Sequence, residues 1–557
     1  MLNPRENALK KITGFTAAAL ALATFAMAHA QDDPAPRKAG GASTAAEPEK
    51  KQETLPPDAG SEGSVTVGGR KIDYRAVAGL IAVGSSNAQD ATIGLDGAQL
   101  PGSGTELVPK PEDRPATAQM FYTAYFAKGA DAGTRPVVFI YNGGPGSATM
   151  YLRMASIGPV RVQIPDVQHQ FGGPYKVLPN QFTLLDAADL VFIDAPGTGY
   201  SRVQGKDSGK AFYGIDQDAA AFDRFIRRFL SKYDRWTSPR FLFGESYGTT
   251  RSAALSAALQ HSGVDLNGIV LLSQILSFDN SADGSDGNPG TDNGNFLALP
   301  SFAATAWYHH KVPGAPARLE PWIHEVEQFA LGDYAAALLQ GADLDPARRQ
   351  AVAGKLESYT GVPAALWIKA NLRLTGGEFS KYLQDSSDIT TGRLDSRYQG
   401  PAMDPLSREA DYDPFTESVE SAILAAMNSH AHGTLKFGQN MTYKPSANDP
   451  GFSWDMHHRG TGSDSWNTFT NVSGDLAYTM KVNPHMHVLL MGGYFDLGTL
   501  YFGAVYEMKH LPMPLALQKN IDYKFFETGH MVYVNEDSLH AMHDRVAEFI
   551  RANQNAQ

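Results

Sequence analysis

The pentapeptide Gly244-Glu245-Ser246-Tyr247-Gly248 contains the residue of this chain best suited to covalent chemistry. Glycines on both sides of the serine let the backbone turn sharply and lift the hydroxyl above the end of a strand. A serine in that position becomes a nucleophile when a neighbouring base takes its proton. The pattern also occurs by chance, so an ordinary turn serine is the alternative interpretation.

A base and an orienting acid are available near the C-terminus. Asp496 follows the apolar run 488–491 and two glycines, and His530 follows the strand-like run 523–526. In α/β-hydrolases the three catalytic residues occur along the chain in the order serine, acid, histidine. We therefore predict Ser246 as nucleophile, His530 as base and Asp496 as the acid that orients the base.

A second glycine-rich loop, Asn142-Gly143-Gly144-Pro145-Gly146, follows the apolar run 137–141. Acyl transfer needs backbone N–H groups that stabilise an oxyanion, and in α/β-hydrolases a loop of this kind supplies one of them. The N–H of Tyr247, directly after the serine, is the expected second donor. An ordinary Gly/Pro turn is the alternative interpretation of the loop.

The segments around these residues predict the elements that position them. Short apolar runs, typical of buried parallel strands, occur at 137–141, 190–193 and 241–243. Apolar residues recur at helical spacing within 217–233, and a second helix is expected over 250–259. This alternation predicts a doubly wound, mostly parallel sheet, and together with the serine turn it predicts the α/β-hydrolase fold.

The alternation of strands and helices stops after residue 276. A loop rich in Gly, Asp and Asn follows, then a long stretch of mainly helical pattern, and a strand pattern returns near residue 487. We predict a largely helical cap insertion over 277–435. It divides the α/β-hydrolase core into a first part, 65–276, and a second part, 436–557.

The N-terminal segment has the pattern of a targeting signal. Basic residues precede the apolar run 12–27, and Ala28-His29-Ala30 provides small residues for cleavage, so 1–30 is predicted to be a signal peptide. An N-terminal membrane anchor is the alternative. The segment 31–64 is rich in Pro, Ala, Gly and charge and is predicted to be a disordered linker. No second apolar run is long enough to span a membrane, so no stable membrane insertion is expected after cleavage.

Composition excludes several other kinds of function. The formal net charge is -12 without a Lys/Arg cluster, so no nucleic-acid partner is expected. The chain has no cysteine, which rules out disulfides and a thiolate nucleophile and fits a bacterial periplasmic or extracellular protein. Adjacent histidines at 309–310 and 457–458 point in different directions, and the acidic loop 279–292 lacks EF-hand spacing. We expect no metal and no organic cofactor, and the sequence leaves the oligomeric state open.

At five sequence blocks the chain resembles the serine carboxypeptidase family, peptidase family S10. The resemblance covers roughly residues 70–550 apart from the cap. In chain order the blocks are NGGPGS at 142–147, DAPGTGYSR at 194–202, GESYGTTRS at 244–252, GGYFD at 492–496 and TGHMV at 528–532. Five blocks in the family's order are far more specific than any one of them.

The resemblance implies an enzyme that releases C-terminal residues from peptide substrates through an acyl-enzyme. It implies the same triad, with Gly144 and Tyr247 as oxyanion donors. It also implies that Asn142 and Glu245 bind the free C-terminal carboxylate of the substrate. An ionised glutamate would repel that carboxylate, so acidic pH should favour peptide hydrolysis.

Three positions depart from the family's usual pattern. Ile140 replaces a tryptophan that would donate from its indole, Ser147-Ala148 replaces Cys-Ser, and Tyr494 replaces an aspartate. These differences leave the triad unchanged and concern the recognition of the C-terminal carboxylate.

Three other functions are compatible with parts of this pattern. Proline iminopeptidases also use a GGPG loop, but theirs begins with His rather than Asn and their serine turn lacks the preceding Glu. An esterase or acyltransferase could use the same acyl-enzyme. A non-catalytic binding protein on the same scaffold would have no need of an intact triad and two oxyanion loops.

Overall fold

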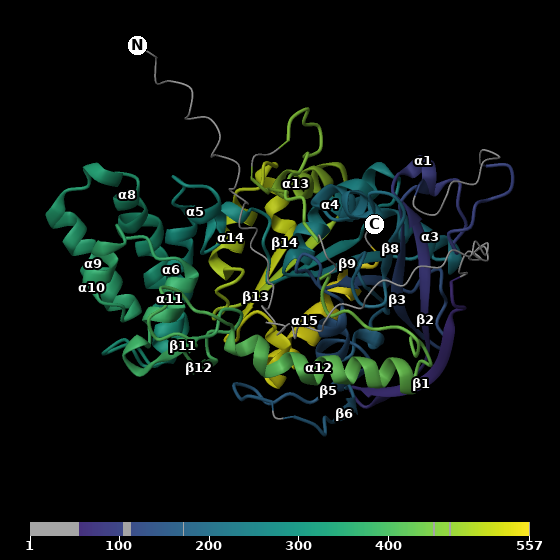
Figure 1. Cartoon of the computed structure of the whole chain (residues 1–557), viewed down its shortest axis with the longest axis horizontal. Helices are drawn as coiled ribbons and strands as arrows, with labels where there is room; N and C mark the ends of the chain where they lie inside the picture. The colour runs from purple at the N-terminus through teal and green to yellow at the C-terminus, as the bar shows by residue number, and fades with distance from the viewer. Residues whose placement is uncertain (1–54, 104–112, 171, 449–451, 467–468, 556–557) are drawn as a thin grey trace, which may run out of the picture.

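The computed structural model describes residues 55–103, 113–170, 172–448, 452–466 and 469–555 (Figure 1). The predicted signal peptide 1–30 and most of the predicted linker 31–64 lie outside these ranges. The last part of that linker was predicted wrongly, because Ala59–Val67 forms strand β1 and pairs antiparallel with β2 (Arg70–Gly84). Strand pairing uses backbone groups, so a segment poor in large apolar side chains can still join a sheet. Its last residues, Val65 and Val67, contribute buried side chains.

A ten-stranded sheet forms the centre of the described chain, with strand order β1-β2-β3-β7-β4-β9-β10-β13-β14 and β8 paired with β3. From β7 to β14 all neighbours are parallel. The remaining strands of this sheet are β3 (Thr117–Ala127), β4 (Val137–Tyr141), β7 (Asp189–Ile193), β8 (Arg202–Gln204), β9 (Arg240–Glu245), β10 (Gly268–Leu272), β13 (His487–Gly493) and β14 (Ile521–Phe526). Two small antiparallel pairs join β5 (Val160–Val162) to β6 (Val177–Pro179) and β11 (Ile389–Thr391) to β12 (Gln399–Pro401).

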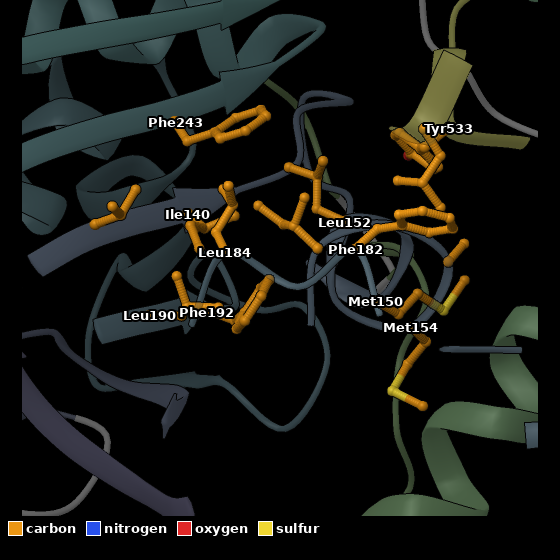
Figure 2. Close-up of a cluster of buried hydrophobic side chains, with 14 of the residues drawn as sticks. Ile140, Met150, Leu152, Met154, Phe182, Leu184, Leu190, Phe192, Phe243 and Tyr533 are labelled. Atoms are coloured by element: carbon orange, nitrogen blue, oxygen red, sulfur yellow. The ribbon is translucent and has the colours of Figure 1, made fainter. Parts of the chain in front are cut away.

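Helices cover both faces of the sheet. Successive strand residues point to opposite sides, and here the side chains on both sides are apolar and need covering. On one face Phe139 and Leu242 pack with side chains of α3, α4, α13 and α14. On the other, Ile140 and Phe243 belong to a cluster with α12 and α15, part of which Figure 2 shows. The helices of the two layers are α3 (Ile215–Lys232), α4 (Tyr247–His261), α12 (Pro414–Gly433), α13 (Ser473–Val482), α14 (Tyr501–Lys509) and α15 (Glu536–Asn553). This is the predicted α/β-hydrolase architecture.

The segment between β10 and α12 is mostly helical and has its own buried cluster. Side chains from 282–383 pack there with Phe495 and Tyr501 from the loop and helix after β13. Its helices α8–α11 lie at one end of the molecule, far from β1 (Figure 1). They are α5 (Gly284–Gly287), α6 (Asn293–Tyr308), α7 (Leu319–Phe329), α8 (Ala335–Leu338), α9 (Pro346–Thr360), α10 (Ala364–Lys369) and α11 (Gly376–Tyr382). Since α12 packs instead with the sheet, the cap boundaries 277 and 435 stay a prediction.

Two short helices, α1 (Asn87–Asp90) and α2 (Ser208–Phe212), complete the set of α-helices in the described ranges. Within those ranges no helix is both long enough and apolar enough to cross a membrane.

A fully buried ion pair ties three of these elements together. Arg251 of α4 lies 2.6 Å from Asp218 of α3, and both side chains are 0% exposed. The same guanidinium donates a 2.7 Å hydrogen bond to the carbonyl oxygen of Asn142, just after β4. Its charged group also lies over the rings of Phe222 and Tyr247, a favourable arrangement for a buried cation.

Replacing Arg251 alone should destabilise the protein strongly. In Arg251→Met the Asp218 carboxylate stays buried without its cation, and we expect the free energy of unfolding to fall by about 3–5 kcal/mol. The double variant Arg251→Met/Asp218→Leu leaves no uncompensated charge, so it should lose less than the single variant. Urea unfolding midpoints of the two variants test this order, and a double variant less stable than the single one would contradict it.

Candidate active site

The predicted site residues converge at one edge of the sheet. Asn142, Ser246, Asp496 and His530 follow the carboxyl ends of the parallel strands β4, β9, β13 and β14. The strands are in parallel register, with Glu245 of β9 opposite Leu272 of β10. Loops that leave the same edge of a parallel sheet therefore meet above it, as in other open α/β sheets.

The backbone at Ser246 has the sharp turn that the sequence predicted. Its φ is 63° and its ψ is -132°, a conformation that costs energy for a residue with a side chain. A Cβ at Gly244 would lie 2.2 Å from the carbonyl oxygen of Gly248, so only glycine fits there. Within the described residues no hydrogen bond joins the Ser246 hydroxyl to His530, a bond that is often long in unliganded hydrolases.

The imidazole of His530 is held by a buried carboxylate. Its Nδ1 lies 2.7 Å from Asp496 Oδ2, and the two side chains are 4% and 1% exposed. Thr499 donates from Oγ1 to the same carboxylate oxygen at 2.7 Å, and its backbone N–H donates to Oδ1 at 3.0 Å. Burial alone would lower the pKa of His530, but the charge of Asp496 outweighs it and raises the pKa. This pair can take up a proton and stabilise the resulting imidazolium.

The segment between β11 and β12 contributes to the placement of the histidine. The backbone N–H of His530 donates to the Leu394 carbonyl at 2.6 Å, and its own carbonyl accepts a 2.7 Å bond from Ser273 Oγ. A Cβ at Gly529 would lie 2.4 Å from the Cβ of Asp395, so only glycine lets the loop approach Asp395 this closely. The base is therefore fixed by both the strand ends of the sheet and the segment 394–395.

The two backbone N–H groups that the sequence predicted as oxyanion donors have no acceptor within the described residues. In the described part of the chain, neither the Gly144 nor the Tyr247 amide donates a hydrogen bond. A Cβ at Gly143 would lie 2.4 Å from the nitrogen of Tyr247 and would block that amide. Gly144 itself has a φ of 105°, which favours glycine. Unpaired amides at a loop and a helix N-terminus are suited to hold an oxyanion.

Glu245 is a buried acid directly before the serine. It is 1% exposed, and Tyr533 donates to both of its carboxylate oxygens at 2.8 and 3.1 Å. Burial raises the pKa of Glu245 to about 7, although His530, Tyr533 and a hydrogen bond from Asn142 each oppose the shift. The structure thus brings together Asn142 and Glu245, the two residues expected to bind a carboxylate.

Two residues that differ from the usual family pattern, Ile140 and Tyr494, pack against apolar or aromatic side chains. Ile140 is fully buried in the cluster of Figure 2 and offers no hydrogen-bond donor. The ring of Tyr494 packs on Tyr501 of α14 with centroids 4.8 Å apart, and on Phe525 of β14 at 6.0 Å.

No group of three or more His, Asp or Glu side chains that could hold a metal ion occurs within the described ranges. The adjacent histidines His457 and His458 pair with different acids, Asp455 and Asp216, as their opposite directions predict.

Sequence reasoning missed two side chains of the site. Thr499 lies three residues after Asp496, and Tyr533 lies three residues after His530. The sequence does not reveal which acid each hydroxyl contacts. Tyr533, for example, donates to Glu245, which is 288 positions away in the chain.

Comparison with known proteins gives a partial but consistent match. The serine carboxypeptidase family, peptidase family S10, matches residues 111–276. The retinoid-inducible serine carboxypeptidase of Mus musculus is 32% identical over 149 residues, which are 26% of this chain and 29% of that protein. The pheromone-processing carboxypeptidase KEX1 of Saccharomyces cerevisiae is 33% identical over 120 residues, 20% of this chain and 15% of that protein. The chain thus spans less than a third of the length of these relatives.

Among solved structures, the prohormone-processing carboxypeptidase Kex1 from Saccharomyces cerevisiae has a TM-score of 0.44 at 14% identity, covering 86% of this chain and 91% of that one. Proline iminopeptidase from Mycobacterium smegmatis has a TM-score of 0.33 at 12% identity, covering 78% and 96%. The matched segment 111–276 contains Asn142, Glu245 and Ser246 in their family blocks. Over that segment, about 30% of its length, the chain is similar to the serine carboxypeptidase family.

Proposed function

We propose that this protein is a serine-type carboxypeptidase that releases C-terminal residues from peptides. The observation that supports it best is the buried Glu245, which has a pKa of about 7 and lies beside the serine with Asn142 and Tyr533 around it. A simple esterase has no need of a protonated carboxyl group at this place. A carboxypeptidase does, because that group can donate a hydrogen bond to the substrate's C-terminal carboxylate.

The proposed reaction proceeds through an acyl-enzyme. His530 takes the proton of Ser246 as the hydroxyl attacks the peptide carbonyl, and Asp496 stabilises the imidazolium. The N–H groups of Gly144 and Tyr247 stabilise the oxyanion. His530 then returns the proton to the departing amino group, and a water molecule, activated in the same way, releases the shortened peptide.

In this proposal Asn142 and protonated Glu245 bind the substrate's carboxylate. The Ile140 side chain offers no hydrogen-bond donor, so binding of the carboxylate depends on these two residues and on Tyr533, which orients the glutamate. An esterase or acyltransferase on the same triad is the alternative. The signal pattern of residues 1–30 supports export to the periplasm or the medium, and peptides are the proposed partners.

Substrates that differ only in their C-terminal group test the proposal. A blocked dipeptide with a free carboxylate should be cleaved much faster than its C-terminal amide, with the largest ratio at the acidic end of a series from about pH 4 to 8. Ser246→Ala should abolish both hydrolysis and labelling by a fluorophosphonate, because no nucleophile remains.

Equal cleavage of acid and amide, or cleavage of simple esters alone, would favour the esterase or acyltransferase. Fluorophosphonate labelling that survives in Ser246→Ala would rule out Ser246 as the nucleophile.

The pH dependence of peptide hydrolysis should follow Glu245. In the wild type, kcat/KM for the free-acid dipeptide should fall as the pH rises through about 7, since the ionised glutamate repels the substrate. Glu245→Gln stays neutral and should remove that fall. Tyr533→Phe should move it to higher pH, because the Tyr533 hydrogen bond lowers the pKa of Glu245.

An ester without a carboxylate is the matched control for these profiles. Its hydrolysis should not show the fall, because no substrate charge faces Glu245. A wild-type profile for the peptide that rises from pH 6 to pH 8 would contradict the role of the protonated glutamate.

A further inference from the structure

The segment 452–458 packs against both proposed oxyanion loops. The ring of Phe452 lies so close to Gly146 that a Cβ there would be 3.0 Å from it. The ring of Trp454 meets Tyr247 edge-on, with centroids 5.3 Å apart and planes at 83°. Asp455 pairs through its backbone with Tyr213 and Ile215, at the start of α3. The position of this segment therefore limits where the Gly144 and Tyr247 amides can lie.

The segment ends at His458, whose buried ring lies between two carboxylates. Nδ1 is 2.6 Å from Oδ1 of Asp216, in the first turn of α3, and Nε2 is 2.8 Å from Oδ2 of Asp475, in the first turn of α13. The contact between Nε2 and Asp475 is a close charge pair rather than an aligned hydrogen bond. The His458 side chain is only 3% exposed. Backbone N–H groups of Arg459 and Thr461 donate to the same two carboxylates.

This arrangement calls for a charged ring. A neutral imidazole has one N–H and one acceptor nitrogen. Its unprotonated nitrogen would therefore face one of the two carboxylates, and the two lone pairs would repel each other. Burial alone lowers the pKa of His458, but Asp216 and Asp475 raise it to about 9. The charged side chains next to His458 in the sequence have other partners, since His457 pairs with Asp455 and the Arg459 guanidinium with Asp464.

Tyr247 is held from two sides by acids of the same helix turn. On one side Asp218 binds Arg251, whose charged group lies 5.3 Å from the centre of the Tyr247 ring. On the other side Asp216 binds His458, which ends the segment that carries Trp454. Both acids lie in the first turn of α3, where the helix dipole favours negative charge.

We propose that His458 is a positioning residue, which acts as a cationic clamp between Asp216 and Asp475 and so holds the segment 452–458 against the oxyanion loops. The inference rests on the proposed function. It adds that formation of the oxyanion depends on a histidine outside the triad. The charged His458 ring binds both carboxylates, and this double interaction is lost as the ring deprotonates, when the pH rises through the His458 pKa of about 9.

The test compares His458→Gln with His457→Gln, the same change at the exposed neighbouring histidine. The first readout is hydrogen exchange of peptides that contain 452–459 and 213–216, which does not depend on activity. The second is the rate of acylation by an activated ester or a fluorophosphonate. We expect His458→Gln to speed exchange in both peptides and to slow acylation about 10- to 100-fold, because small misplacements of catalytic groups have effects of that size. His457→Gln should change neither.

A pH readout covers the case that His458→Gln does not fold. In the wild type, acylation should decline above about pH 9, together with faster exchange in 452–459. Asp216→Asn removes one of the two charges that raise the pKa of His458, so both changes should occur at lower pH.

Faster exchange with unchanged acylation in His458→Gln would overturn the inference, leaving the pair a purely structural contact. So would an alkaline limit that Asp216→Asn does not move. Failure of the proposed function is distinguishable, because it would appear in the wild type as equal cleavage of the free-acid and amide dipeptides, whatever the exchange results.

Discussion

The buried pair of Arg251 and Asp218 is the interaction on which the geometry of the site depends most. It joins α3 to α4 through two fully buried side chains, and the arginine also contacts the carbonyl of Asn142 just after β4. The loop with Gly144 and the helix that begins at Tyr247 are thus fixed to one guanidinium. An arginine suits this position because its planar group donates in several directions at once, which a lysine cannot do.

The positions of the elements that hold the site could largely be predicted from the sequence. The strand runs 137–141, 190–193 and 241–243 lie within β4, β7 and β9, and the two predicted helices lie almost wholly within α3 and α4. Buried parallel strands are short and continuously apolar, so local composition is enough to locate them. The triad was then predicted from the order serine, acid, histidine among residues that follow such strands.

The parts that escaped prediction depend on contacts between distant segments. Tyr533 meets Glu245 and His458 meets Asp216, each pair being more than two hundred positions apart. No local pattern distinguishes these side chains from other tyrosines and histidines. Likewise, α12 has an ordinary helical pattern, and only its packing with the sheet separates it from the helices of the cap. Such contacts are settled by the folded topology rather than by spacing along the chain.

The composition of β1 has a consequence for how copies of this protein behave toward one another. In the described sheet β1 is the outermost strand, and one row of its backbone groups faces away from β2. An unpaired strand edge can recruit a strand from another molecule, and long apolar edges lead to aggregation. Here the edge has glycines, serines and Glu62, which pairs with Lys128. The shortage of apolar side chains that made this strand look like a linker thus guards the sheet against association between molecules.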